Sequence, residues 1–401
     1  MQNHNREILS SKGNELENKR IVLCVCGSVA AFRSVEIARE LIRHGADVIC
    51  VTSKNAGKII NPNLLEWATG NKVVEELTGE LEHIRLAGEH KERADLILVA
   101  PATANAISKV ACGIDDTTVT TVISTALGSG IKVMFVPAMH YSLYANPFVA
   151  ENVKKLLKNE IEIIEPRVEE GKAKIPNSEE IVDYVIRALG KKDMRGKKVV
   201  VTAGATREYL DDIRFISNPS SGKMGLAIAR EAWLRGTDVS LIHGHVDIEI
   251  PRYIKAIKAE TTEEMHKQVL GNKADIYVLA GAPTDFRTKR VRGKISSERS
   301  LSITIVPTIK ISESIKKKYR KAKLVLFKAE SNVSEKELVE TARKKLAKAN
   351  GDLIVANDVS KSNAGFASEE NEIWIIGRKN EVVKKRATKN KLAGLILDSI
   401  E

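Results

Sequence analysis

Residues 21–28 read Ile-Val-Leu-Cys-Val-Cys-Gly-Ser, an apolar stretch that ends in a glycine and a serine. Residues 199–204 read Val-Val-Val-Thr-Ala-Gly and end in a similar way. A helical pattern follows each stretch, over 33–44 and over 224–235. Many α/β proteins bind phosphate where a strand meets a helix through such a turn, because free N–H groups and the helix dipole face the anion. The repeat therefore predicts two phosphate-binding domains.

The length of 401 residues supports this division, because a chain of this size exceeds a single hydrophobic core. We expect a flexible tail over 1–19, a first domain over 20–189, a short polar linker over 190–196 and a second domain over 197–401. No apolar run approaches the ~18 residues of a membrane span, and the first twenty residues lack the apolar core of a signal peptide. The sequence predicts a cytoplasmic protein with no membrane partner.

Cysteine and charge narrow the class of protein further. The four cysteines lie among apolar or small residues, so we expect buried thiols in a reducing compartment. The formal net charge is +12. The basic runs Lys316–Lys318 and Lys384–Arg386 are interpreted as solvated helix faces, and no aromatic-interleaved basic strand accompanies them. We therefore expect anionic small-molecule substrates and no nucleic acid.

Strands and helices alternate through the first domain. This alternation predicts a doubly wound, mainly parallel sheet, whose ligand lies beyond the carboxyl ends of the strands. The predicted strands are Ile21–Cys26, Val48–Thr52, Leu96–Ala100 and Lys132–Pro137.

The first glycine turn distinguishes between cofactors. Residues 27–31 (Gly-Ser-Val-Ala-Ala) lack the G-x-G-x-x-G spacing of dinucleotide sites, and no acidic residue ends the second strand to bind a ribose. The hydroxyls of Ser28 and Ser53, with adjacent backbone N–H groups, suit a single phosphate. We therefore expect a mononucleotide in preference to NAD.

Four segments of this domain resemble the homo-oligomeric flavin-containing cysteine decarboxylases. They are residues 27–31, Leu81–Leu86, Ala100–Asn105 and Pro137–His140. The resemblance covers residues 20–187 and implies a flavodoxin-like fold with bound FMN. It also implies that the flavin carries the redox chemistry which lets a cysteine-derived carboxylate leave as CO₂.

The same resemblance gives individual residues a role. It implies that Gly27, Ser28 and Ser53 hold the FMN phosphate and that Thr103 and Asn105 line the flavin. It also implies that His83 is the catalytic histidine and that His140 contacts the substrate carboxylate.

Two positions depart from that family's pattern. His140 stands where the family usually has asparagine, although an imidazole N–H can make the same donor contact. The stretch Glu165–Lys172 lacks the cysteine that bacterial members carry after the last strand. The proton donor of the final reduction is therefore open, with Cys112 and Glu169 as candidates.

The second domain repeats the alternation. Residues 218–225 (Asn-Pro-Ser-Ser-Gly-Lys-Met-Gly) open its first helix but lack P-loop spacing, since methionine follows the lysine where a metal-binding hydroxyl is needed. Alone, this stretch is either a phosphate cradle or an ordinary helix start. The predicted strands are Lys198–Thr202, Val239–Ile242, Ile276–Ala280, Leu324–Phe327 and Leu353–Ala356.

Residues 201–225 resemble phosphopantothenate–cysteine ligases, and the resemblance continues through Ala280–Arg287, Phe327–Glu330 and Asn357–Ser360. It implies a Rossmann-like fold in which 4′-phosphopantothenate and CTP form an acyl-cytidylate that cysteine then attacks, with Mg²⁺ bridging the phosphates. Asn218 and Lys294 would then be catalytic. The implied substrate contacts are Arg214, Asp285, Phe286, Phe327 and Lys223.

Some details stay open. Pro283 and Thr284 replace residues of the bacterial ligases, so CTP and ATP both remain candidate nucleotides. The side chains that would contact the metal ion are not identified. The decarboxylase family forms trimers and the ligase family forms dimers, so the resemblance implies a homo-oligomer.

The two resemblances name consecutive steps of one pathway. The product of the ligase, 4′-phosphopantothenoylcysteine, is the substrate of the decarboxylase, which releases 4′-phosphopantetheine. We therefore predict a bifunctional enzyme of coenzyme A biosynthesis. The alternatives are a flavin-binding scaffold with decayed chemistry and, less favoured, an NAD-dependent oxidoreductase.

Overall fold

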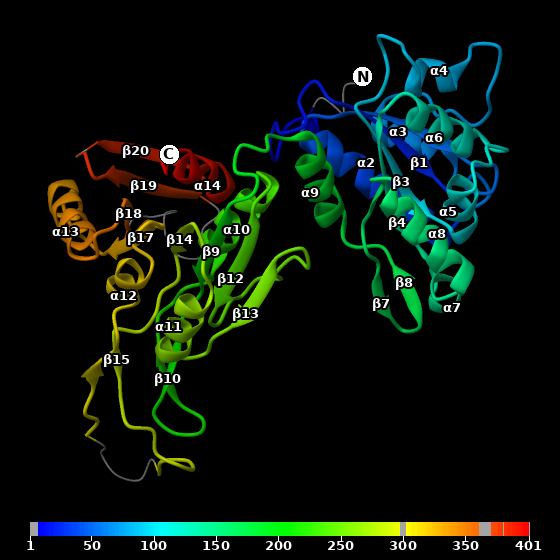
Figure 1. Ribbon diagram of the computed structural model, residues 1–401. Helices are drawn as coiled ribbons and strands as arrows, with labels where there is room; N and C mark the ends of the chain where they lie inside the picture. The colour runs from blue at the N-terminus through cyan, green and yellow to red at the C-terminus, as the bar shows by residue number, and fades with distance from the viewer. Residues whose placement is uncertain (1–6, 297–301, 361–369, 380, 401) are drawn as a thin grey trace. The chain divides into compact units, whose positions relative to one another are not determined.

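The computed structural model describes residues 7–296, 302–360, 370–379 and 381–400. The chain divides into two compact units, with the boundary between Gly190 and Lys191 (Figure 1). Each unit is built around its own mainly parallel sheet, so each is described separately.

The sheet of the first unit has five strands in the order β2-β1-β3-β4-β6, and every pair is parallel. This is the flavodoxin-like order, in which the strand order reverses between β1 and β3. The expected fold of this domain is confirmed. The strands are β1 (Arg20–Val25), β2 (Asp47–Thr52), β3 (Leu96–Ala102), β4 (Lys132–Pro137) and β6 (Glu162–Ile163).

Helices cover both faces of this sheet, because its strands are apolar on both sides. Val22 and Cys24 of β1 belong to a core that also takes in Leu86, Ile107 and Val122 of the helices on one face. Alternate residues of the same strand face the other side. The helices are η1 (Val29–Arg33), α2 (Ser34–Arg43), α3 (Pro62–Thr69), α4 (Glu82–Ala87), α5 (Ala104–Ala111), α6 (Thr118–Gly128), α7 (Tyr141–Tyr144), α8 (Pro147–Lys158) and α9 (Ser178–Leu189).

A small antiparallel sheet follows β4 along the chain. It consists of β5 (Met139–His140), β8 (Lys172–Lys174) and β7 (Arg167–Glu169), in that spatial order. The stretch without the expected cysteine therefore forms a hairpin that pairs with the strand carrying His140.

Residues 7–19 pack on α2 where a flexible tail was expected. The side chain of Leu16 is completely buried, and its backbone N–H donates to the carbonyl of His44 at 2.9 Å. The Lys12 ammonium donates to the Glu40 carboxylate at 2.7 Å. The buried leucine explains the difference, since its apolar surface leaves water when the segment packs.

The sheet of the second unit has eight strands in the order β13-β12-β9-β14-β17-β18-β19-β20. The first six are parallel in the Rossmann-like order, which confirms the expected fold; β19 and β20 add an antiparallel hairpin that was not predicted. The strands are β9 (Lys198–Ala203), β12 (Asp238–His243), β13 (Lys255–Lys258), β14 (Ile276–Leu279), β17 (Lys323–Glu330), β18 (Leu353–Asp358), β19 (Glu370–Gly377) and β20 (Val382–Thr388).

Helices again lie on two faces. Helices α10 (Lys223–Leu234) and α14 (Lys389–Asp398) pack on each other. Helices α11 (Thr262–Gly271), α12 (Ile311–Lys318) and α13 (Glu335–Lys348) contribute to one core with the sheet. Two short antiparallel pairs stand apart from the main sheet: β10 (Arg207–Tyr209) with β11 (Phe215–Ser217), and β15 (Phe286–Arg287) with β16 (Val306–Pro307).

Two expectations about side chains need correction. Cys24, Cys26 and Cys50 are buried thiols, but Cys112 is exposed because it caps the C-terminal end of α5. The run Lys384–Arg386 lies on strand β20 and not on a helix; there Lys384 pairs with glutamates of α13 and β19. Within the described ranges, no helix is both long and apolar enough to cross a membrane.

Gly225 sets how closely α10 approaches β9. A Cβ atom at this position would lie 2.7 Å from the Cβ of Ala203 and 2.7 Å from the carbonyl oxygen of Thr202. These distances are too short for any side chain, so the glycine allows the helix to start directly against the strand.

Substituting Gly225→Ala should therefore push α10 away from β9 and lower the free energy of unfolding of the second unit by about 1–3 kcal/mol. Gly271→Ala is the control, because nothing lies within 4 Å of a Cβ there and alanine favours a helix by up to about 1 kcal/mol. Urea unfolding followed by circular dichroism measures both. Equal stability of the two variants would contradict the packing argument.

Candidate functional sites

A cavity of about 220 Å³ lies at the switch point of the first unit, beyond the carboxyl ends of β1 and β3. It brings together Gly27, Ser53, Thr103 and Asn105, all of which were predicted from the sequence. We call it the first-unit cavity. It is also lined by Cys26, Lys54, Asn55, Ala106, Lys109, Thr117, Val119 and Thr120.

Local chemistry holds these residues in place. A Cβ atom on Gly27 would lie 2.6 Å from the Cβ of Asn55, so the loops after β1 and β2 can meet only at a glycine. The Thr103 hydroxyl accepts from the N–H of Ala106 at 3.2 Å and caps α5. Burial raises the pKa of the Cys26 thiol to about 12, so this thiol stays neutral at physiological pH.

Ser28 lies beside the cavity and does not line it. Its hydroxyl donates to the carbonyl of Ala138 at 3.1 Å and accepts from the N–H of Ala30 at 3.4 Å. Ser28 therefore joins the end of β4 to the turn after β1. Its predicted contact with a phosphate remains a prediction.

The two histidines of the first unit also lie outside the cavity lining. His83 is on α4, and its Nδ1 atom is shielded from solvent without a hydrogen-bond partner among the described residues. Such unpaired buried groups are uncommon and require an explanation. His140 is exposed on β5, opposite Lys172 of the hairpin.

The second unit carries two cavities around the end of β17, of about 410 Å³ and 360 Å³. We call the first the loop cavity, because residues 218–225 line it, and the second the lysine cavity. The walls that both cavities share are Gly281, Pro283, Asp285, Phe327, Lys328 and Lys345.

The loop cavity lies at the switch point between β9 and β14. Gly222 is the N-cap of α10 in the left-handed conformation, with a φ of 80°, and no side chain caps the helix. N–H groups of the first helical turn therefore remain available to an anion. The Asn218 amide donates to the carbonyls of Ala282 and Pro283 at 3.2 and 3.3 Å, which ties the two loops together.

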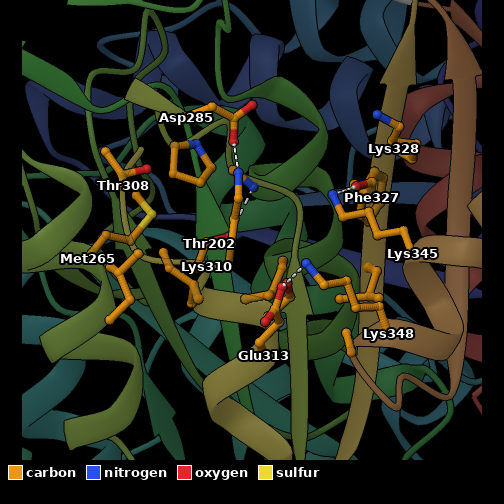
Figure 2. A pocket seen from close by; sticks show the side chains of 18 of the residues that line it. Thr202, Met265, Asp285, Thr308, Lys310, Glu313, Phe327, Lys328, Lys345 and Lys348 are labelled. Atoms are coloured by element: carbon orange, nitrogen blue, oxygen red, sulfur yellow. Dashed lines mark hydrogen bonds and ion pairs between the residues drawn. The ribbon is translucent and has the colours of Figure 1, made fainter. Parts of the chain in front are cut away.

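The lysine cavity is strongly basic (Figure 2). The Lys310 ammonium pairs with the Asp285 carboxylate, and Lys348 pairs with Glu313 at 2.9 Å. The Lys345 ammonium donates to the carbonyl of Phe327 at 2.8 Å. Burial, together with the nearby charge of Lys328, lowers the pKa of Lys345 to about 8.

Three predicted residues of this unit lie outside both cavity linings. The Arg214 guanidinium donates to the carbonyl of Ile295 at 3.0 Å, so it contacts the residue after Lys294. Both segments converge on Asp211, whose pKa the backbone N–H groups of Arg214, Ile213 and Ile295 lower to about 2. Phe286 is exposed on β15.

No cluster of three or more histidine, cysteine, aspartate or glutamate side chains suited to a metal ion occurs in the part of the chain that the structure describes.

Comparison with known proteins covers the whole chain. Residues 9–190 match the family model described as flavoprotein, and residues 194–401 match the DNA/pantothenate metabolism flavoprotein C-terminal domain. The coenzyme A biosynthesis bifunctional protein CoaBC of Thermococcus kodakarensis is 50% identical over 407 residues, covering 100% of this chain and 99% of that protein. This chain belongs to the CoaBC family.

A second member of the CoaBC family, from Methanocaldococcus jannaschii, is 38% identical over 395 residues, covering 98% of this chain and 95% of that protein. Among solved structures, the C-terminal domain of a coenzyme A biosynthesis bifunctional protein CoaBC matches with 31% identity and a TM-score of 0.44. It covers 51% of this chain and 94% of that domain.

In this member of the CoaBC family, the sequence analysis missed the cavity lysines Lys310, Lys345 and Lys348. A pattern on α13 could have pointed to Lys345, which follows the buried residue Ala342 by three positions and so shares its helix face. Lys310 gave no such signal, because its place depends on the loop that leads into α12.

The lowered pKa of Lys345 leads to a pH-dependent affinity for anions. The ammonium is protonated below about pH 8 and loses its charge as the pH rises through that value, so an anion should bind more weakly at higher pH. We expect the dissociation constant of CTP to rise about tenfold between pH 7 and 9.5, measured by calorimetry.

The control is Lys345→Arg, because a guanidinium keeps its charge over this whole range. Its affinity for CTP should stay nearly constant between pH 7 and 9.5. The same steep decline in both proteins would assign the pH dependence to another group.

Proposed function

We propose that this protein is bifunctional and catalyses two consecutive steps of coenzyme A biosynthesis. The second unit joins 4′-phosphopantothenate to cysteine with CTP, and the first unit decarboxylates the resulting 4′-phosphopantothenoylcysteine to 4′-phosphopantetheine. The observation that carries this proposal is the match to CoaBC proteins along 100% of the chain. The cavities at both switch points support it, because open α/β sheets bind ligands there.

The loop and lysine cavities together suit a nucleotide and an acyl substrate. In the ligase reaction, a carboxylate oxygen of 4′-phosphopantothenate attacks the α-phosphorus of CTP, and pyrophosphate leaves. Asn218, Lys223, Asp285 and Phe327 line the loop cavity, where charge develops on the phosphorus and on the acyl carbon. We infer that Mg²⁺ arrives with the nucleotide phosphates, as is common for such substrates.

Arg214 and Lys294 do not line the cavities in which the nucleotide is proposed to bind. Both lie around Asp211, away from the cavity linings of their own chain. Phe286, Ile213 and Phe215 are exposed apolar side chains of the same region. We infer that this surface pairs with a second copy in a dimer, which would bring Arg214 and Lys294 to a substrate.

The first-unit cavity suits the phosphate end of FMN. Its donors are Ser53, Thr103, Asn105 and the ammonium groups of Lys54 and Lys109, and the loops meet closely at Gly27. At about 220 Å³ it is smaller than the ~300 Å³ at which pockets for complete small molecules begin. When bound, FMN would supply the redox chemistry that permits loss of the carboxylate.

If the first-unit cavity holds the phosphate end of FMN, the rest of the cofactor must be covered by residues outside this cavity. Val29 and Phe32 of η1, next to the turn at Gly27, are 78% and 64% exposed. Large apolar side chains so exposed are typical of a protein interface. We infer that this surface is a contact between first units, in the trimers that the resemblance to the cysteine decarboxylases implies. The buried thiols Cys24, Cys26 and Cys50 are consistent with a reducing cytoplasm.

One observation favours a second candidate function. The hairpin of β7 and β8 carries Glu169, Glu170 and Lys174 in ion pairs and no thiol. A flavin-binding scaffold with decayed decarboxylase chemistry would fit this feature. Adding 4′-phosphopantothenoylcysteine should bleach the flavin and release CO₂ in an enzyme, whereas a scaffold would stay yellow.

The overall test is a mass spectrum of the product. The protein with 4′-phosphopantothenate, cysteine, CTP and Mg²⁺ should give 4′-phosphopantetheine and CMP. An unsaturated enethiol product would mean that the final reduction is missing, and no CMP would contradict the ligase.

His83→Asn should abolish release of CO₂ and leave formation of CMP unchanged, because His83 lies in the first unit and the nucleotide is proposed to bind the second. An imidazole can accept and donate a proton, and the amide of asparagine cannot replace it in that role. Both products are measured on the same sample. Parallel loss of CO₂ and CMP would contradict two separate sites.

Asn218→Asp should have the opposite effect. A carboxylate would place a negative charge where charge develops on phosphorus, so formation of CMP should fall at least about 100-fold. Decarboxylation of supplied 4′-phosphopantothenoylcysteine should continue at the unmodified rate. A variant that ligates normally would remove Asn218 from the proposed site.

A further inference from the structure

The small antiparallel sheet of the first unit brings together the two departures that the sequence showed (Figure 1). His140 lies on β5, and the stretch without the expected cysteine forms β7, β8 and the turn between them. His140 stands directly opposite Lys172 on β8, which in turn stands opposite Glu169 on β7. Residues opposite each other across an antiparallel sheet project from the same face. The three side chains therefore form one row, which we call the sheet row.

The small sheet is fixed to the rest of the first unit. Ala173 of β8 is buried, and the Arg167 guanidinium lies 3.6 Å from the buried Glu180 carboxylate of α9. The backbone N–H of Tyr141 donates to the carbonyl of Gly171, in the turn of the hairpin, at 2.9 Å. Successive residues of a strand face opposite ways, so the sheet row points away from the buried side of β8. Its side chains are therefore presented to a ligand by a fixed support.

One end of the sheet row carries two groups that can bind an anion. Glu169 and Glu170 both pair with Lys174, at 3.6 and 2.7 Å. In contrast, neither the His140 imidazole nor the Lys172 ammonium makes a hydrogen bond or a salt bridge with the described residues. The Cβ atoms of residues opposite each other are about 5 Å apart, so one carboxylate can reach both groups. This end of the row suits the contact with the substrate carboxylate that the sequence predicts for His140.

The reaction proposed for the first unit needs a proton at one particular carbon. The cysteinyl CH₂–SH group is first oxidised to a thioaldehyde, with bound FMN as the acceptor of two electrons and two protons. The bond from Cα to the carboxylate then breaks, CO₂ leaves, and the electron pair stays on the substrate as an enethiolate. Cα must take up a proton before the two electrons return to the carbon that bears sulfur. The carbon that loses CO₂ is therefore the carbon that needs an acid.

We propose that His140 is this acid and takes over the role of the absent cysteine thiol. The inference rests on the proposed decarboxylase reaction. The protonated imidazole first binds the carboxylate together with Lys172, which places the imidazole beside Cα. Once CO₂ has left, two positive charges face each other without the carboxylate between them. Their repulsion favours transfer of the imidazolium proton from nitrogen to Cα.

The two departures from the family's pattern then compensate each other. An amide can donate a hydrogen bond to the carboxylate but is no acid, so an asparagine at this position needs a thiol elsewhere. An imidazolium can do both, first as the donor to the carboxylate and then as the source of the proton. A histidine at position 140 therefore makes a thiol in the hairpin unnecessary.

The two acids named from the sequence suit this step less well. Cys112 ends α5 and lies outside the small sheet. Glu169 is two strands away from His140, a distance of about 10 Å at the usual strand spacing. Its carboxylate pairs with Lys174, and an ionised carboxylate has no proton to give.

The test is a single turnover of 4′-phosphopantothenoylcysteine without air by the full chain with bound FMN. His140→Asn keeps a donor for the carboxylate but removes the acid. It should still release CO₂, while formation of 4′-phosphopantetheine should fall at least about 100-fold. A mass spectrum should show the unsaturated enethiol in its place. The flavin should stay bleached, because its electrons are not returned to the substrate.

A binding measurement separates contact with the carboxylate from proton transfer. 4′-Phosphopantothenoylserine has the carboxylate but no thiol, so it can bind without reacting. Calorimetry should give similar affinities for the unmodified protein and His140→Asn, and an affinity about tenfold lower for Lys172→Gln. Equal affinity in Lys172→Gln would remove Lys172 from the carboxylate contact and contradict the repulsion that drives the proton transfer.

Lys174→Gln is the matched control, because Lys174 shares the face of Lys172 on β8 but pairs with glutamates of the hairpin. It should give saturated 4′-phosphopantetheine, as should Cys112→Ser and Glu169→Gln. Saturated product or no CO₂ from His140→Asn would overturn the inference, and so would enethiol from either of the other two acids' variants. An unmodified protein that releases no CO₂ would contradict the decarboxylase proposal itself.

Discussion

Parallel strands place all their carboxyl ends at one edge of a sheet, and the loops separate where the strand order reverses. Both units of this protein depend on that constraint. In the first, the gap between β1 and β3 holds the first-unit cavity. In the second, the gap between β9 and β14 holds the loop cavity. A ligand can enter there without disturbing the core, because the strand ends offer unpaired backbone groups and diverging loops.

This constraint explains which site residues could be predicted from the sequence. Gly27, Ser53 and Thr103 each follow a predicted strand closely, so the pattern of strands was enough to bring them together. Such residues need no knowledge of side-chain packing, since the topology alone places them at one edge. Asn218 and Asp285 of the second unit were predicted from the resemblance to the ligases instead, and Asn218 lies far along the chain from the end of β9.

Other residues depended on contacts that no local pattern records. Lys345 reaches its cavity because α13 packs on the sheet and leaves one lysine half-buried. Asn371 lines the loop cavity from an antiparallel strand whose partner, β20, is almost entirely exposed and rich in lysine. An edge strand of that composition resembles a solvated helix or loop in the sequence, so this wall of the loop cavity was not foreseen.

The segment 7–19 has a consequence for how the first unit can exist by itself. Leu16 fills a slot beside the end of α2, so a shortened protein that starts at Arg20 would open this slot to water. Residues 7–19 therefore belong structurally to the first unit, although they precede its first strand. If the two activities were separated into individual genes, the flavoprotein half would be more stable with residues 7–19 than without them.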